Sequence, residues 1–134
     1  MLALVAGCAT DHLEHPWLGF AIDEARDANK PLVVEFYADW CKPCALFASA
    51  VLPDPRVQLA LKDVMFLRYN IDTPTGRDAM KRCRVRGIPT VVGIDHAGFV
   101  RVKKTGTEPT ADEFLVFLRQ ARTALTTTDP PPAP

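Results

Sequence analysis

The sequence predicts an α/β domain, built as a mixed four-stranded sheet with helices on both faces. Three observations lead to this fold class. Short runs of branched and aromatic residues, typical of buried strands, alternate with segments of helical periodicity. The first two runs flank a helical segment, so they should be parallel and joined by a right-handed crossover. The last two are separated by the turn His96-Ala97-Gly98, which predicts an antiparallel hairpin.

The first half of the chain supplies two helices, one strand and a helical turn. Apolar residues spaced by helical turns predict a helix over residues 17–28, which Asn29-Lys30-Pro31 ends. Leu32-Val33-Val34-Glu35-Phe36-Tyr37 predicts a buried strand. A helix should follow through Cys44, Leu46, Phe47 and Ala50, with prolines at 53 and 55 stopping it, and residues 57–61 should form a short helical turn.

The second half supplies the other three strands and the closing helix. Residues 64–69, 90–94 and 99–103 are predicted as strands, and residues 75–83 as a helix. Thr110 and Glu113 have the spacing of a capping box. The helix that they open carries an apolar stripe: Phe114, Phe117, Leu118 and Ala121.

Length, charge and cysteine count exclude several classes of protein. A chain of 134 residues fits one domain with short tails. Its 16 Lys and Arg balance 16 Asp and Glu, so it lacks the basic excess of a general nucleic-acid binder. No apolar run approaches the roughly 20 residues of a membrane span. Four cysteines are too few for a disulfide scaffold of this length.

Both ends of the chain differ from the middle in composition. Val5-Ala6-Gly7-Cys8 resembles a bacterial lipobox, which makes Cys8 a candidate for lipidation; the alternative is a frayed apolar end with an incidental thiol. We therefore expect a lipoprotein-signal remnant or linker over residues 1–13 and the folded domain over residues 14–125. The Thr- and Pro-rich residues 126–134 should form a disordered tail.

The clearest chemical motif is Trp40-Cys41-Lys42-Pro43-Cys44, placed where a strand ends and a helix begins. A thiol at a helix N-terminus is stabilised as thiolate, and Lys42 adds a cation beside it. Cys44, one helical turn later, can resolve a mixed disulfide made by Cys41. Pro43 fits the first turn of a helix. A zinc half-site and an inert structural disulfide stay open as alternatives; haem attachment is excluded because Ala45 follows Cys44.

The sequence resembles the thioredoxin superfamily over about residues 17 to 124. The resemblance rests on the motif above with its preceding strand, on Asn70-Ile71-Asp72, on Val85-Arg86-Gly87-Ile88-Pro89-Thr90 and on Gly106. The form Ala38-Asp39-Trp40-Cys41 and the segment Asp54-Pro55-Arg56-Val57 are most similar to the C-terminal domain of DsbD-type thiol:disulfide interchange proteins. The resemblance implies a thioredoxin-like fold and a redox-active Cys41–Cys44 disulfide.

The resemblance also assigns expected roles to residues that shape the site. Pro89 matches the cis-proline that faces the disulfide, although a trans-proline opening a strand is the alternative. The backbone at Ile88 would then pair with a substrate strand. Trp40 matches a tryptophan that covers the site, against the alternative of a core aromatic. Gly106 matches the glycine after the last strand.

Glu35 matches a buried acid that is proposed to move protons for the second cysteine. Burial would raise its pKa toward a useful range. The family commonly has Asp there, so the longer Glu changes the reach toward Cys44, and a Glu turned to solvent is the alternative. Arg68 matches a position where many thioredoxins carry Lys near that acid, or else it is a surface cation. Cys83 is expected to be a small buried hydrophobe.

These observations predict a thiol–disulfide oxidoreductase that reduces protein disulfides in the periplasm through a Cys41/Cys44 cycle. It would use no cofactor besides that disulfide, bind no metal and no nucleic acid, and act as a monomer. A membrane electron-donor protein of DsbD type would reduce it again, and a lipid anchor at Cys8 would attach it to the membrane. A disulfide oxidase or isomerase, or a non-catalytic binding module, are the alternatives.

Overall fold

A computed structural model describes residues 17–106 and 110–125 of the chain. The predicted signal remnant or linker with Cys8, and the predicted Pro-rich tail at 126–134, lie outside the described residues. Along the described chain, helices and strands follow one another as α2 (Leu18–Asp27), β1 (Leu32–Tyr37), α3 (Lys42–Leu46), the π-helical turn η1 (Phe47–Val51), α4 (Pro55–Leu61), β2 (Met65–Asn70), α5 (Pro74–Arg82), β3 (Thr90–Ile94), β4 (Val100–Thr105) and α6 (Ala111–Leu125).

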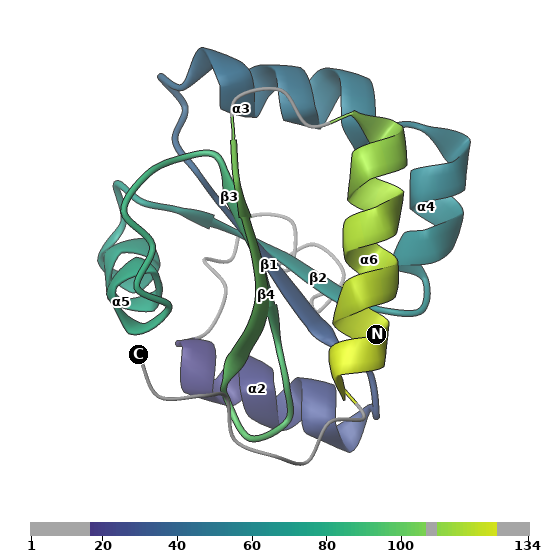
Figure 1. Ribbon diagram of the computed structural model, residues 1–134. Coiled ribbons are helices and arrows are strands. Elements are labelled where there is room, and N and C mark those ends of the chain that lie inside the picture. The colour runs from purple at the N-terminus through teal and green to yellow at the C-terminus, as the bar shows by residue number, and fades with distance from the viewer. Residues whose placement is uncertain (1–16, 107–109, 126–134) are drawn as a thin grey trace, which may run out of the picture.

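The four strands form one mixed sheet in the order β2-β1-β3-β4 (Figure 1). β1 and β2 run parallel, with Glu35 opposite Arg68. β3 runs antiparallel to β1, with Glu35 opposite Val91, and β4 runs antiparallel to β3. The parallel pairing of β1 with β2 and the antiparallel hairpin of β3 and β4, both predicted from the sequence, are therefore confirmed. β1 lies inside the sheet, which explains why nearly every residue of that strand is buried.

Helices cover both faces of the sheet and create two separate cores. Alternate residues of β1 point to opposite faces. Val34 and Phe36 belong to the core under α2 and α5, whereas Val33 belongs to the core under η1, α4 and α6. Figure 1 shows this arrangement, with α5 on one side of the sheet and α6 with α4 on the other. Glu35 has the same strand parity as Val33, so a carboxyl is inserted among apolar side chains.

Two helix ends show how local sequence sets the boundaries. α2 is followed by Asn29, which has a φ of 52°, and the N–H of Lys30 donates to the carbonyl of Ala25 at 2.9 Å. This is a Schellman ending, in which Asn is one of the few residues that tolerate a positive φ. α4 begins two residues earlier than predicted. Pro55 opens that helix, because Asp54 caps it and proline fits the first helical position.

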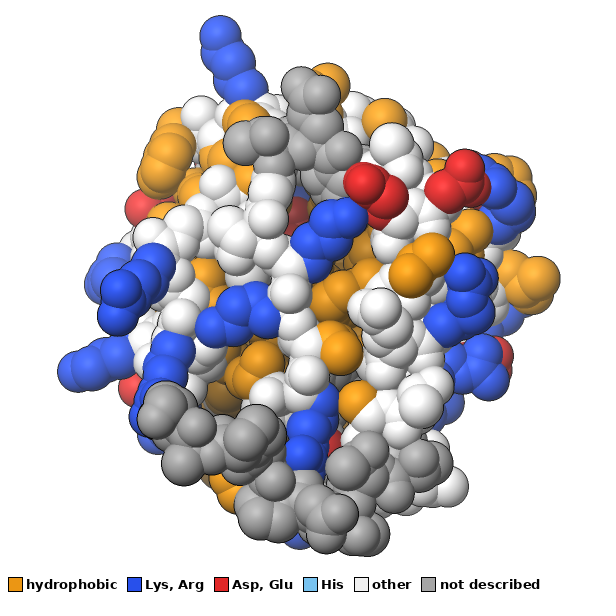
Figure 2. All heavy atoms as spheres, viewed as in Figure 1, with side chains coloured by type: hydrophobic (Ala, Val, Ile, Leu, Met, Phe, Trp, Pro, Cys, Tyr) orange, Lys and Arg blue, Asp and Glu red, His pale blue; other side chains and the backbone are white. Residues whose placement is uncertain are grey.

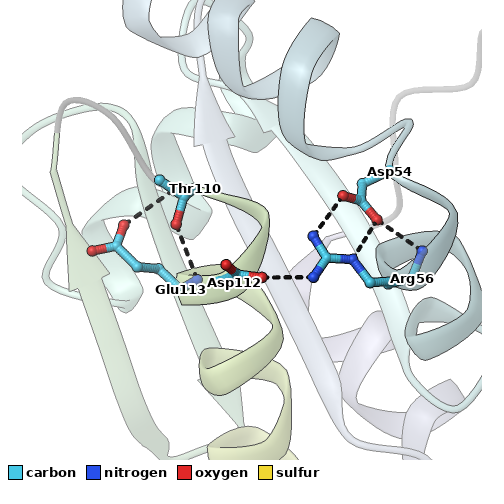
Figure 3. A network of polar contacts seen from close by, with 5 residues as sticks. All are labelled: Asp54, Arg56, Thr110, Asp112 and Glu113. Carbon is cyan, nitrogen blue, oxygen red and sulfur yellow. Dashed lines mark hydrogen bonds and ion pairs between the residues drawn. The ribbon is translucent and has the colours of Figure 1, made fainter.

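A polar network fastens the start of α6 to the start of α4 (Figure 3). The predicted capping box is confirmed: the N–H of Glu113 donates to Oγ1 of Thr110 at 3.2 Å, and Oε2 of Glu113 accepts from the N–H of Thr110 at 3.1 Å. Arg56 bridges the two helices, since its guanidinium donates to Asp54 at 2.9 Å and to Asp112 at 2.7 Å. These exposed pairs align the helices but contribute little free energy.

The remaining boundaries differ from the predictions by one or two residues, for identifiable reasons. α5 begins at Pro74 because Thr73 caps it, with Oγ1 accepting from the N–H of Gly76 at 3.0 Å. β4 begins at Val100 because the buried Asp95 organises the preceding turn. Its carboxylate accepts from the N–H groups of Ala97 and Phe99, each at 2.9 Å.

Candidate redox-active site

Cys41 and Cys44 form a disulfide at the end of β1, with their Cα atoms 5.2 Å apart. Cys41 is the N-cap of α3, and its Sγ accepts from the N–H of Cys44 at 3.3 Å. Only 6% of Cys41 and 1% of Cys44 is exposed. The first cysteine is therefore the one that a partner can reach, and the second lies behind it. The attacking role expected for Cys41 and the resolving role expected for Cys44 require this order of exposure.

The helix that starts at Cys41 favours a thiolate there. Its first N–H groups have no partner inside the helix, and the positive end of the helix dipole lies at the same point. Pro43 lies in the first turn, where a missing N–H costs nothing. Lys42 is exposed next to the disulfide. The sequence did not predict that this helix widens into the π-helical turn η1, which places Phe47 and Val51 in the core.

Trp40 is on the surface, 67% exposed, so the alternative of a core aromatic is wrong. Its indole Nε1 donates to Oδ2 of Asp72 at 2.9 Å. The N–H of Asp72 in turn donates to Oδ1 of Asn70 at 2.9 Å, at the end of β2. The large exposed ring is thus held beside Cys41 by a hydrogen bond. The role of Asp72 was missed by sequence reasoning, which noted the residue only as part of a motif.

The loop before β3 brings Ile88 to the disulfide. The Ile88–Pro89 peptide bond is cis. The half-buried Ile88 packs against the cluster of Ala38, Cys41 and Cys44. Pro89 is buried, and its carbonyl accepts from the N–H of Gly106 at 3.3 Å. This loop therefore contacts the disulfide cluster through Ile88 and the end of β4 through Pro89.

Glu35 is fully buried in β1, so the alternative of a solvent-facing side chain is wrong. Arg68 pairs with it from the adjacent strand: Nε donates to Oε2, and Nη2 lies 3.5 Å from Oε1. The Arg68 guanidinium also lies 4.3 Å from the ring centre of Tyr37. Burial raises the pKa of the Glu35 carboxyl above its ordinary value, although the Arg68 cation and its hydrogen bond work in the opposite direction.

Two further features define what surrounds the site. A cavity of about 20 Å³, room for a single water, lies beside Pro89 and Gly106. Cys83 is buried at the end of α5, as expected for a small hydrophobe, and burial raises the pKa of its thiol to about 11. In the described part of the chain, no three metal-ligating side chains come together.

A family model described as thioredoxin-like matches residues 14–95, more than half of the chain. The chain belongs to the thioredoxin-like family. Solved structures agree with this assignment. A thioredoxin from Thermus thermophilus aligns with a TM-score of 0.70 at 28% identity, covering 85% of this chain and 92% of that one. The oxidised C-terminal domain of DsbD from Neisseria meningitidis aligns with a TM-score of 0.66 at 30% identity, covering 78% and 93%.

Curated relatives include full-length interchange proteins. The thiol:disulfide interchange protein DsbD of Pseudomonas fluorescens is 36% identical over 107 residues, covering 78% of this chain and 18% of the relative. DsbD of Salmonella paratyphi A is 38% identical over 76 residues, covering 55% and 13%. The chain thus spans less than a fifth of the length of these relatives. Within residues 17–106 and 110–125, no helix is both long and apolar enough to cross a membrane.

The fold and the family predicted from the sequence are confirmed. Together, the Cys41–Cys44 disulfide and the relatives support the predicted class of enzyme, a thiol–disulfide oxidoreductase. The alternatives of a zinc half-site and an inert structural disulfide receive no support from these relatives.

Proposed function

We propose that the protein reduces disulfide bonds in other proteins in the periplasm. The observation that carries this proposal is the Cys41–Cys44 disulfide, placed beside the exposed Trp40 and the half-buried Ile88. Because only 6% of Cys41 is exposed, and Cys44 is more deeply buried, the substrate must present its reactive group at the surface beside Trp40. A disulfide carried by a protein fulfils that condition.

The proposed reaction moves two electrons and needs no cofactor besides the cysteine pair. The Cys41 thiolate attacks one sulfur of the substrate disulfide, which forms a mixed disulfide and releases one substrate thiolate. Cys44 then loses its proton and attacks Sγ of Cys41. This step forms the Cys41–Cys44 disulfide and releases the second substrate thiolate. Each released thiolate takes up a proton, so the substrate leaves as a dithiol.

Three groups would assist this cycle. The backbone at Ile88 would pair with an extended substrate segment next to Pro89, in the manner of an added strand. The exposed ring of Trp40 would cover the mixed disulfide. Glu35, whose pKa is raised by burial, would accept the proton of Cys44 during the second step. Arg68 would position that carboxylate through their ion pair.

The oxidised protein must recover two electrons from a partner. Similarity to DsbD supports a membrane electron-donor protein of that type and a periplasmic location. Cys8, as a lipidation site, would anchor the chain to the membrane. Replacing Cys8 by alanine should then release the protein into the soluble fraction. The protein would act as a monomer without nucleic acid or metal.

Trapping the mixed disulfide tests the proposal. Cys44→Ser should leave Cys41 joined to protein substrates in a periplasmic extract, as complexes that dissolve on adding dithiothreitol. Cys41→Ser should form none. Cys83→Ser is the matched control, because this thiol is buried away from the site and should leave trapping unchanged.

The same experiment separates the alternatives. Capture that survives the loss of both Cys41 and Cys44 would establish a non-catalytic binding module. Oxidised wild-type protein that forms disulfides in reduced substrates, together with reduced wild-type protein that leaves oxidised substrates unchanged, would establish an oxidase or isomerase. Either result contradicts the proposed direction.

A further inference from the structure

A dense basic surface covers α5 and the loop that follows it. Five of the ten residues at 77–86 are cationic and exposed, and Lys103 of β4 joins them: Arg77, Lys81, Arg82, Arg84, Arg86 and Lys103. Figure 2 shows Lys and Arg side chains gathered on the side of the molecule where α5 lies. We call these six residues the basic surface. The whole chain is neutral by formal count, so this concentration is local.

Few acidic groups compensate this charge. Arg82 pairs with Asp78 at 2.8 Å. Arg77 donates to the backbone carbonyl of Asp72 at 2.7 Å, a contact that leaves its charge in place. No acidic side chain of residues 17–106 or 110–125 forms an ion pair with Lys81, Arg84 or Arg86. The basic surface therefore keeps most of its positive charge available to a partner.

Both ends of the basic surface reach the redox site. At one end, Arg77 contacts Asp72, which also holds the indole of Trp40 beside Cys41. At the other end, Arg86 lies two residues before Ile88, which packs against the disulfide. Lys103 connects β4 to the middle of the basic surface, because its Nζ donates to the carbonyls of Cys83 and Arg84 at 2.9 and 3.0 Å. A polypeptide bound at the disulfide would thus extend across these cations.

The structure of α5 explains only part of this charge. Cations in the last turn of a helix stabilise its dipole, which accounts for Lys81 and Arg82. Arg77 lies in the first half of the helix, where a cation gains nothing from the dipole. Arg84 follows the helix with a φ of 52°, a conformation that glycine adopts more easily. Stability of the helix is therefore not a sufficient reason for cations at these positions.

We infer that the basic surface selects partner proteins in which the reducible disulfide is flanked by an acidic segment. This inference rests on the proposed function and names the substrate class for the same site. A protein is favoured over an anionic membrane because the cations adjoin the disulfide and Ile88, where a substrate chain must pass. Charge complementarity at the rim of such a site raises the rate of encounter rather than the rate of exchange.

The test compares three synthetic peptides with the same intramolecular disulfide, flanked by Asp and Glu, by Ser, or by Lys. The rate constant for their reduction by the reduced protein is measured between about 20 mM and about 300 mM salt. Acidic flanks should raise this rate constant on the order of tenfold over Ser flanks at low salt. The advantage should shrink at high salt, and Lys flanks should slow the reaction.

Charge-reversal variants show which cations produce the preference for acidic flanks. The triple variant Lys81→Glu, Arg84→Glu, Arg86→Glu should lose the preference for acidic flanks and keep the rate with Ser flanks. The matched control reverses three exposed cations on the opposite side of the sheet, Lys62, Arg119 and Arg122, and should keep the preference. Circular dichroism verifies that both triple variants are folded.

The outcomes distinguish this inference from the proposed function. If the wild-type protein reduces none of the peptides, the proposed function fails. Equal reduction of acidic and Ser-flanked peptides would overturn the inference alone. The inference would also be overturned if the control triple variant lost the preference for acidic flanks as strongly as the variant of Lys81, Arg84 and Arg86. Binding of anionic phosphatidylglycerol vesicles that requires the three cations, without a preference among peptides, would reassign the basic surface to membranes.

Discussion

Replacing Gly76 by alanine should destabilise the protein strongly, because the helix α5 approaches β2 through this glycine. A Cβ at position 76 would lie 1.8 Å from the carbonyl oxygen of Asn70 and 2.6 Å from its carbonyl carbon. Both are backbone atoms at the end of β2, so no side chain can rotate away. The helix and the strand would have to separate.

The expected loss is about 3 kcal/mol in the free energy of unfolding, the upper end of the usual range for overpacking. Gly19 provides a matched control in α2, because a Cβ there meets no atom within 4 Å. Alanine at position 19 should stabilise the protein by about 0.5 kcal/mol, since glycine is the poorer helix former. Replacing glycine by alanine should thus lower the free energy of unfolding at position 76 and raise it at position 19.

Equilibrium unfolding in urea measures both effects from the shift of the midpoint at unchanged slope. The Gly76 variant should also change the fluorescence of Trp40, since Asn70 and Asp72 support that ring. If Gly76→Ala unfolds within about 0.5 kcal/mol of the wild-type protein, the close approach of α5 to β2 is wrong, because overpacking of this kind costs more.

Further predictions concern the charged and thiol groups. Burial raises the pKa of Glu35 above its ordinary value of 4.5, so the folded protein binds the carboxyl proton of Glu35 more tightly than the unfolded chain does. The free energy of unfolding therefore falls as pH rises above 4.5 and this proton is lost. Glu35→Gln should therefore stabilise the protein at neutral pH, with a gain that disappears toward pH 4.5 in urea titrations. Arg84→Gly should stabilise the protein by about 1 kcal/mol, since φ is 52° there, yet slow the reduction of acidic peptides; a loss of stability would contradict the assigned backbone conformation. Cys83, with a pKa of about 11, should resist iodoacetamide at pH 8 while Cys41 of the reduced protein is alkylated, as peptide mass mapping would show.

The sequence was sufficient for the sheet and for the disulfide, because both depend on local patterns. β1 is a continuous apolar run, and the two cysteines follow it directly at the spacing of one helical turn. The capping box at Thr110 and Glu113 was predictable for the same reason. Proline is ambiguous in the sequence: the pattern makes Pro55 a stop for one helix, whereas in the structure it opens the next.

Contacts between distant segments were the part that sequence could not supply. Glu35 is buried because helices cover both faces of β1, and its partner depends on the register that places Arg68 opposite it. The support of Trp40 by Asp72 joins residues 32 positions apart. The basic surface is visible in the sequence as a charge run. Its relation to the disulfide emerges only once the loop at Ile88 is placed.

The direction of electron flow is the central claim, and the midpoint potential of the Cys41–Cys44 pair tests it most directly. The protein is equilibrated in graded thiol–disulfide buffers, and alkylated thiols are counted by mass, with Trp40 fluorescence as a second signal. Our account predicts a midpoint near the thioredoxin value of about −270 mV, as expected for an electron donor. A midpoint near about −120 mV, typical of the oxidant DsbA, would contradict it.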